Sequence, residues 1–267
     1  MGMKKKNGAR SYVITTYLVF GLMVLGICGG ASMIFHAPPL VMRILSNICA
    51  WSPTIVLMIM WSRLRPNQSR REFWKEAFSG DINFLLLVIP PVIVVGGSLL
   101  TVWIVSIIQK KSFASYYSLG AYPLLASFFL SLLSGPTGEE AGWRGYLRVE
   151  LNKKYSFMRA SIVQGLIWAF WHTVLWFVDS DFTGLYLIPY IISNVIVMTS
   201  LVIIMNVVLE KQNNLFYSIV IHFAFNFIYC FLLVDIAFYV VLSVVYLLIA
   251  MGVLYYRRKS KNVIGSM

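Results

Sequence analysis

The chain has 267 residues, of which 59% are hydrophobic and only 12% charged, and its mean hydropathy is +0.78. Soluble domains are about 45–50% apolar and about 25% charged, so this composition excludes an ordinary soluble domain and indicates a membrane protein. The formal net charge of +12 would suit a nucleic-acid partner, but the Lys and Arg residues lie in short connections between apolar runs. That pattern is typical of membrane orientation, so we expect no nucleic-acid partner.

Apolar runs separated by polar or helix-breaking residues predict an all-α bundle of about eight transmembrane helices. We expect one integral membrane domain over residues 1–267, in which Pro90 and Pro91 kink or break the third helix. The predicted spans, in chain order, are 11–35, 45–61, 83–108, 121–133, 157–178, 185–209, 215–234 and 237–256. The N-terminal spans (11–108) carry no motif, and a core at about 121–234 carries all of the motifs described here.

The distribution of basic residues predicts how these spans are oriented. If the N-terminus is cytoplasmic, 19 of the 22 Lys and Arg residues fall in cytoplasmic segments, and only Arg43, Lys110 and Lys111 fall outside them. The positive-inside rule therefore favours cytoplasmic positions for both termini. The short Lys-rich ends suggest an integral protein of a bacterial cell membrane.

Two adjacent acids, Glu139 and Glu140, follow the apolar run of the fourth predicted span. An ionised carboxylate near hydrocarbon costs about 2.5–3.5 kcal/mol even on lenient insertion scales, so acids here mark a candidate functional site. If the segment is helical, Arg144 lies four residues after Glu140 and can pair with it, which leaves Glu139 free. The Gly-Pro pair just before the acids predicts a broken or re-entrant helix start. The alternative is an ordinary interfacial helix start whose acids face water.

Polar residues also interrupt the fifth and seventh predicted spans. His172 follows Trp168 by one helical turn, and His222 lies one turn before Asn226, close enough to hold one ligand between them. Taken singly, these could be core histidines or polar pairs that pack helices. Together with a carboxylate they supply what peptide hydrolysis by activated water requires: a base, imidazoles to orient the water or a metal, and an oxyanion donor. We expect them to meet at membrane depth in a cavity open to the cytoplasm.

Three motifs stand in order in this multispan chain: Glu139-Glu140-x-x-x-Arg144, an aromatic-x-x-x-His172, and His222-x-x-x-Asn226. Together they resemble the CAAX-protease and bacteriocin-processing (Abi) family of intramembrane proteases, whose best-known branch is the Rce1-type prenyl-protein endoprotease. The resemblance covers about residues 122–228 and implies six site residues. These are Glu139, Glu140, Arg144, His172, His222 and Asn226.

The resemblance also implies a role for each of these residues. Glu139 would be the carboxylate that activates water, and His172 and His222 would complete the water or metal site. Asn226 would be the oxyanion donor. Trp168 stands where the family often has phenylalanine, which puts the shape of the pocket in question.

The residues fit a glutamate-dependent protease and a metal-dependent one equally well. Glu139, His172 and His222 form an acceptable ligand set for a divalent metal such as zinc, with an open fourth position. In that case Glu140 becomes the candidate base. Otherwise the resemblance makes Glu140 and Arg144 structural or substrate-positioning.

Three classes of function remain open from the sequence. The first is an intramembrane endopeptidase that cleaves peptide or protein substrates, lipidated or not, near the cytoplasmic leaflet. The second, which the resemblance also implies, is a non-catalytic membrane partner in bacteriocin immunity or sensor control. The third is a transporter that uses the buried Glu and His residues as an ion relay, although no inverted repeat is visible in the sequence.

Overall fold

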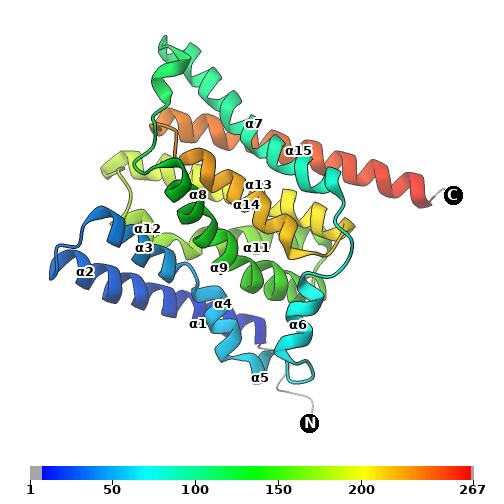
Figure 1. The fold of residues 1–267 in the computed structure, drawn as a ribbon. Coiled ribbons are helices and arrows are strands. Elements are labelled where there is room, and N and C mark those ends of the chain that lie inside the picture. Colours follow the sequence, from blue (N-terminus) through cyan, green and yellow to red (C-terminus); the bar gives the residue numbers. More distant parts are fainter. Residues whose placement is uncertain (1–7, 266–267) are drawn as a thin grey trace.

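Long apolar helices build the structure, a computed structural model that describes residues 8–265 (Figure 1). Lys4, Lys5 and Lys6, which contribute to the predicted orientation, lie outside the described residues. Within residues 8–265 there is no β-strand, so the predicted all-α class is confirmed. Six helical segments are long and apolar enough to cross a membrane, and they coincide with six of the predicted spans. They are Gly8–Met33, Pro39–Ile59, Phe84–Gln109, Phe157–Val178, Gly184–Lys211 and Ile236–Lys261.

The fourth and seventh predicted spans are helical but shorter than a bilayer crossing, which needs about 20 residues. Helix α14 (Leu215–Tyr229) has 15 residues and α8 (Leu124–Leu133) has 10. The chain after α8 continues as helical pieces, namely α9 (Gly135–Glu140), the π-helix η3 (Ala141–Leu147) and α10 (Arg148–Asn152). The count of eight transmembrane helices is therefore not confirmed.

The remaining helices lie on either side of this segment in the sequence. The helices before α8 are α1 (Gly8–Met23), η1 (Val24–Cys28), α2 (Gly29–Met33), α3 (Pro39–Cys49), α4 (Ser52–Ile59), α5 (Trp61–Leu64), α6 (Arg70–Ala77), α7 (Phe84–Gln109) and η2 (Phe113–Tyr116). The further helices after α10 are α11 (Phe157–Trp171), α12 (Thr173–Val178), η4 (Gly184–Tyr186), α13 (Leu187–Lys211) and α15 (Ile236–Gly265). Helix α7 runs through Pro90 and Pro91 without interruption, so the prolines do not break it.

Most of the basic connections gather at one end of the bundle, which we call the basic end. Asn214, between α13 and α14, donates to the carbonyl of Ser79, between α6 and α7, at 3.2 Å. An ion pair of 2.5 Å ties the last turns of α15 to Glu210 of α13. Helix α1 begins at the same end, since a β-carbon on Gly8 would lie 3.4 Å from the Tyr146 hydroxyl oxygen. Both ends of the described chain therefore share one end of the bundle, and the side of the membrane on which this end lies stays a prediction.

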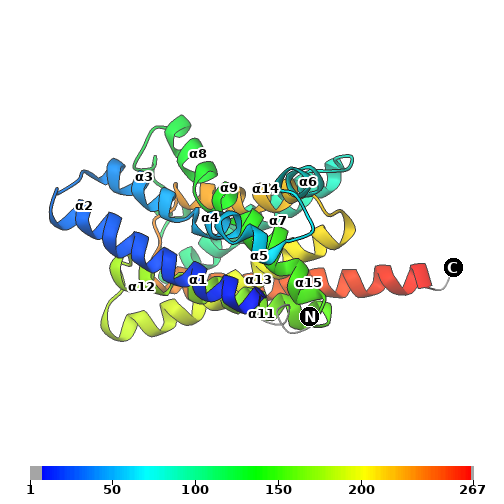
Figure 2. The same cartoon turned by 90° about the horizontal axis from the view of Figure 1, so that it is seen from below.

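The other connections meet at the opposite end, which we call the far end. Gln109, at the end of α7, donates to the Asp235 carboxylate before α15 at 2.6 Å. The backbone N–H of Leu233, after α14, donates to the carbonyl of Tyr116 at 2.8 Å. Figures 1 and 2 show α2 and α12 at the left, away from the C-terminus at the right. The chain thus alternates between the two ends, as the predicted topology requires.

Helix α13 packs against both α11 and α15 and forms the centre of the motif-bearing part. It lies close to α11 at Gly165, where a β-carbon would lie 2.7 Å from the Cα of Thr199. Small residues allow such close approach between helices in membranes. Gly165 therefore sets the distance between α13 and the helix that leads to His172.

We expect Gly165→Ala to lower the thermal stability of the purified protein in detergent, because overpacking a close contact costs about 1–3 kcal/mol. Gly96→Ala is the matched control, since a β-carbon on Gly96 would meet nothing within 4 Å. Alanine is favoured over glycine in a helix by about 0.8–1.0 kcal/mol, so the control should be neutral or stabilising. Equal melting temperatures for the two variants would contradict this account of the α11–α13 contact.

Candidate functional site

The acidic motif lies on a helix that is interrupted at Ser134. Helix α8 ends at Leu133, Ser134 has the non-helical angles φ −80° and ψ −126°, and α9 restarts at Gly135. Pro136 occupies the first turn of α9, where a missing N–H costs nothing. The predicted broken helix start is confirmed. The π-helix η3 follows directly, and single π turns are frequent at functional sites.

Both acids are buried, which rules against the alternative in which they face water. The exposed fractions are 3% for Glu139 and 0% for Glu140 and Arg144. Arg144 Nη1 donates to Glu140 Oε1 at 2.9 Å, which confirms the predicted pairing four residues apart. The guanidinium also lies 4.2 Å from the centre of the Trp168 ring, a cation–π contact that helps to compensate its burial.

His222 is held by the same carboxylate, from α14 across the bundle. Its Nδ1 lies 2.9 Å from Glu140 Oε1, and a carboxylate paired with Arg144 is an acceptor, so Nδ1 carries the proton and donates. The second nitrogen, Nε2, is then left with a free lone pair. Glu140 therefore fixes both the orientation and the tautomer of His222.

His172 has the same tautomer as His222, but a different residue fixes it. It lies at the junction of α11 and α12, and its Nδ1 lies 2.9 Å from the carbonyl oxygen of Trp168. A backbone carbonyl can only accept, so Nδ1 is the donor and Nε2 again keeps its lone pair. The Trp168 ring contacts both imidazoles edge-on, with centroid distances of 5.9 Å to His172 and 5.1 Å to His222.

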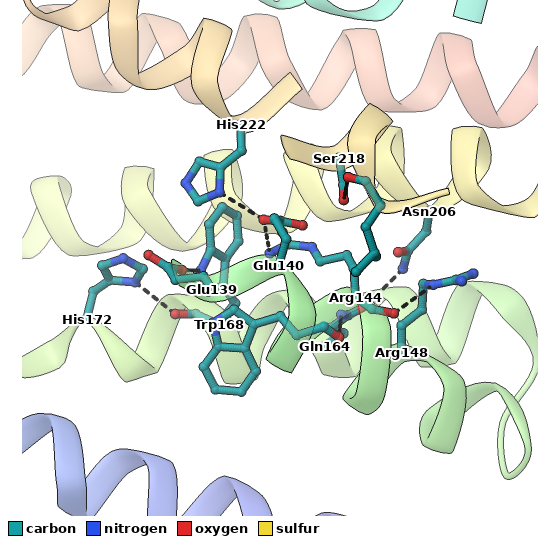
Figure 3. A network of polar contacts seen from close by, with 12 residues as sticks. Glu139, Glu140, Arg144, Arg148, Gln164, Trp168, His172, Asn206, Ser218 and His222 are labelled. Carbon is teal, nitrogen blue, oxygen red and sulfur yellow. Dashed lines mark hydrogen bonds and ion pairs between the residues drawn. The ribbon is translucent and has the colours of Figure 1, made fainter. Parts of the chain in front are cut away.

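Glu139 is oriented by a hydrogen bond that the sequence did not predict (Figure 3). Trp168 Nε1 donates to Glu139 Oε2 at 2.6 Å, which leaves the other oxygen, Oε1, unbonded to it. A β-carbon on Gly135 would lie 2.6 Å from Glu139 Oε1 and 2.8 Å from His222 Nε2, so both acceptor atoms converge beside this glycine. The indole N–H, absent from the phenylalanine common in the family, was the available signal for this role.

A cavity of about 340 Å³ lies beside Gly135 and Glu139. The six predicted site residues fall into two groups, according to whether they line this cavity. Three of them line the cavity: Glu139, His172 and Asn226. The other three form the buried network behind Glu139: Glu140, Arg144 and His222. His222 directs Nδ1 to Glu140 and places Nε2 beside Gly135, which lines the cavity, so the expectation that His222 and Asn226 hold one ligand between them stays a prediction.

Other residues of the cavity come from the halves of the helices that lie towards the far end. They include Arg43 and Ser46 of α3 and Tyr190 and Asn194 of α13. The sequence analysis predicted cytoplasmic termini and also a cavity open to the cytoplasm. No membrane side is assigned by the structure, so both expectations stay predictions.

The site does not single out a set of metal ligands. Among the described residues, no three His, Cys, Asp or Glu side chains are grouped so that they could hold one metal ion. Glu139 Oε2 and both Nδ1 atoms already have partners within the protein. The predicted ligand set of Glu139, His172 and His222 therefore stays a prediction, and no step proposed here passes through a metal.

A second layer of polar side chains supports the network from the basic end. Arg148 Nε donates to the carbonyl of Arg144 at 3.3 Å, and burial together with the Arg144 charge lowers the pKa of Arg148 to about 10. Gln164 donates to the carbonyl of Trp143 at 2.7 Å, and Asn206 donates to Gln164 at 3.0 Å. Sequence reasoning missed these amides, although uncharged polar residues inside apolar spans were a visible signal.

Comparison with known proteins agrees with the motifs. Residues 121–228 match the family described as Type II CAAX prenyl endopeptidase Rce1-like. The resemblance to the CAAX protease family is confirmed. All six predicted site residues lie within the Rce1-like segment, and the N-terminal spans lie outside it.

A curated relative extends the comparison. Over 137 residues the chain is 30% identical to the CAAX prenyl protease 2 of Methanococcus maripaludis, an alignment that covers 49% of this chain and 49% of the relative. The chain therefore spans about half the length of the curated relative that it matches. The likeness supports a family assignment for the motif-bearing part.

We expect Glu140→Gln to destabilise the protein far more than Glu139→Gln. Removing one partner of a buried ion pair leaves the other charge uncompensated and typically costs about 3–5 kcal/mol, whereas Glu139 has no ion pair. The measurement is thermal or denaturant unfolding of both variants in the same detergent. The double variant Glu140→Gln with Arg144→Met should recover part of the loss. A Glu140→Gln variant as stable as wild type would show that the pair is not needed.

Proposed function

We propose that this chain is an intramembrane endopeptidase that hydrolyses peptide bonds with water activated by Glu139. One observation carries the proposal: Trp168 holds one oxygen of a buried carboxylate while the other oxygen and the His222 Nε2 lone pair converge beside Gly135. A base at the inner end of a cavity, next to a second acceptor, suits the capture of a water molecule. The Rce1-like match supports the same class of activity.

In the proposed reaction a water molecule bonds to Glu139 Oε1 and His222 Nε2. Glu139 takes one proton as the water oxygen bonds to the scissile carbonyl carbon, which forms a tetrahedral intermediate. Glu139 then returns the proton to the leaving nitrogen as the carbon–nitrogen bond breaks. The products are a carboxylic acid and an amine, and the carboxylate is regenerated.

Two residues on the cavity wall assist the reaction in different ways. The Asn226 amide is a donor that can stabilise the oxyanion, in the manner of side-chain amides in other acyl-transfer sites. His172 presents an unprotonated Nε2 from the opposite element and orients the attacking water or the leaving amine. The Glu140–Arg144 pair positions His222 and does not touch the substrate.

The substrate class is a peptide or protein, with or without a lipid, in an integral membrane enzyme. The relative is named a CAAX prenyl protease. Lipidated peptides are therefore included in the cleavage experiment described next. Cleavage near the cytoplasmic leaflet stays a prediction. Assignment to a bacterial cell membrane stays a prediction.

We expect the purified protein to cleave one or more members of a panel of quenched peptides, lipidated and unlipidated, and Glu139→Gln to slow cleavage by about 10²–10⁴-fold, the usual contribution of a general base. Asp81→Asn is the control, because Asp81 is an exposed acid at the basic end. Chelator sensitivity would argue for a metal. Cleavage by Glu139→Gln at the wild-type rate would overturn the mechanism, and a host phenotype that survives Glu139→Gln and His172→Ala would favour the non-catalytic partner.

Trp168→Phe should keep the fold and the ring contacts but remove the single N–H donor to Glu139. A hydrogen bond to a charged group contributes about 1.5–3 kcal/mol, so we expect kcat to fall by about ten- to a hundredfold. The KM of the cleaved peptide should change little, since Trp168 is not among the residues that line the cavity. The measurement is steady-state kinetics on the best peptide of the panel. An unchanged kcat would show that Glu139 needs no such support.

A further inference from the structure

We propose that Asn47 and Trp51, in the N-terminal part of the chain, are positioning residues for Glu139. They hold the interruption between α8 and α9 in the geometry that turns Glu139 towards the cavity. The proposal rests on the proposed function for the role of Glu139 as a base. Its structural part, the support of the interruption by the N-terminal helices, does not depend on catalysis.

The interruption creates carbonyl groups that need hydrogen-bond donors. The last four carbonyls of an α-helix have no N–H partner within that helix, and inside a membrane no bulk water replaces the missing partner. Helix α8 ends at Leu133 and the following Ser134 is buried, so these carbonyls lie within the bundle. A buried carbonyl without a donor is costly. The interruption is therefore stable only where side chains supply the donors.

Each of the last four carbonyls of α8 accepts a hydrogen bond from a side chain, and two of the donors are local. Ser134 Oγ donates to the Ser131 carbonyl at 3.0 Å. Thr137 Oγ1 donates to the Leu132 carbonyl at 2.9 Å. These two bonds lie within the interrupted segment itself, so they travel with it and do not fix its place in the bundle.

The other two donors come from the N-terminal helices. Asn47 Nδ2, on α3, donates to the Leu130 carbonyl at 2.9 Å. Trp51 Nε1, at the junction of α3 and α4, donates to the Leu133 carbonyl at 2.7 Å. The partners are 83 and 82 positions apart in the sequence. These bonds therefore tie the end of α8 to a separate part of the fold.

Trp51 also contacts α9 at the residue before Glu139. A β-carbon on Gly138 would lie 2.7 Å from Trp51 Cδ1 and 3.0 Å from Trp51 Cα. Four residues later, a β-carbon on Gly142 would lie 2.7 Å from the carbonyl carbon of Pro53. Small residues spaced by four let a helix approach its neighbour closely. Helix α4 accordingly lies beside α9 in both views (Figures 1 and 2).

Helix α1 holds this junction from its other side. The Tyr12 hydroxyl donates to the Pro53 carbonyl at 3.0 Å, and Tyr12 is fully buried. The Tyr12 ring also meets the Trp143 ring edge-on, with 5.9 Å between the centroids. The start of α4 is thus fixed against the segment that carries the two glutamates.

The proposal extends the site beyond the segment that carries its motifs. The match to the Rce1-like family begins at residue 121, so Asn47 and Trp51 lie outside it. Trp168 orients the carboxylate of Glu139, whereas Asn47 and Trp51 place the backbone from which that carboxylate projects. A catalytic group that is displaced by about 1 Å can lose about 10² in rate. The N-terminal spans therefore serve the reaction without carrying a motif.

Hydrogen–deuterium exchange of the purified protein in detergent, read by mass spectrometry, tests the structural part. Trp51→Phe keeps an aromatic ring and removes the N–H donor to Leu133. We expect backbone exchange in peptides that contain residues 134–138 to rise by about two- to tenfold, the effect of losing one hydrogen bond. Asn47→Leu should raise exchange in the same peptides. Trp103→Phe is the matched control, because Trp103 is 54% exposed on α7 and is not among the residues that line the cavity.

Steady-state kinetics on the best peptide of the panel tests the positioning role. Trp51→Phe should lower kcat by about ten- to a hundredfold. The KM should change little, because Trp51 is not among the residues that line the cavity. In the Glu139→Gln background the same substitution should cause no further loss, since the position of a base that has been removed no longer matters. A merely structural defect would lower the rate by the same factor in both backgrounds.

The two measurements separate this proposal from the proposed function. Unchanged exchange in both Trp51→Phe and Asn47→Leu would overturn the support of the interruption, as would an equal rise in Trp103→Phe. An unchanged kcat in Trp51→Phe, or equal losses with and without Glu139, would overturn the positioning role. If the wild-type protein cleaves no peptide, the proposed function fails, and the exchange data still decide whether the N-terminal helices hold the interruption.

Discussion

The buried ion pair between Glu140 and Arg144 is the interaction on which the rest of the site depends. Both side chains are fully buried, and burying charges is costly unless they are paired and hydrogen-bonded. The pair meets this condition in part. Arg144 Nη1 and Glu140 Oε1 are 2.9 Å apart and the Trp168 ring covers the guanidinium at 4.2 Å, whereas Arg144 Nε and Nη2 and Glu140 Oε2 are buried without a hydrogen-bond partner among the described residues. Glu140 then holds His222, and Trp168 holds Glu139. A single pair of charges thus supports the orientation of the base and of one imidazole.

The two adjacent glutamates have different surroundings, and these surroundings separate their roles. Glu140 shares one oxygen between Arg144 and His222, which makes it a fixed acceptor within the network. Glu139 meets an indole N–H and the cavity, so one of its oxygens remains available. A helix turns about 100° per residue, which is why neighbouring acids can face a network and a cavity at once. Sequence adjacency is therefore compatible with a division between positioning and chemistry.

Local spacing predicted the parts of this arrangement that a single helix determines. The Glu140–Arg144 pair and the broken start at Ser134 follow from residues within a few positions of each other. The contact of His222 with Glu140 joins residues 82 positions apart, and no spacing rule shows which face of α14 turns towards α9. The hydropathy runs predicted eight spans, of which six are long and apolar enough to cross a membrane, whereas α8 with 10 residues and α14 with 15 residues are shorter than a crossing.

The position of Glu139 shows how a small error in helix boundaries changes the expected surroundings of a site residue. The sequence analysis ended the fourth span at 133, which placed Glu139 at the cytoplasmic edge. In the structure the helical path continues through η3 and α10 to Asn152, so Glu139 lies near the middle of that path. The space beyond it is then determined by α13, α14 and α15, which surround a polar cavity only in their far-end halves. The site is therefore built within the helical bundle and not at the edge of the fourth predicted span, because the residues that complete it come from helices that the run 121–133 does not include.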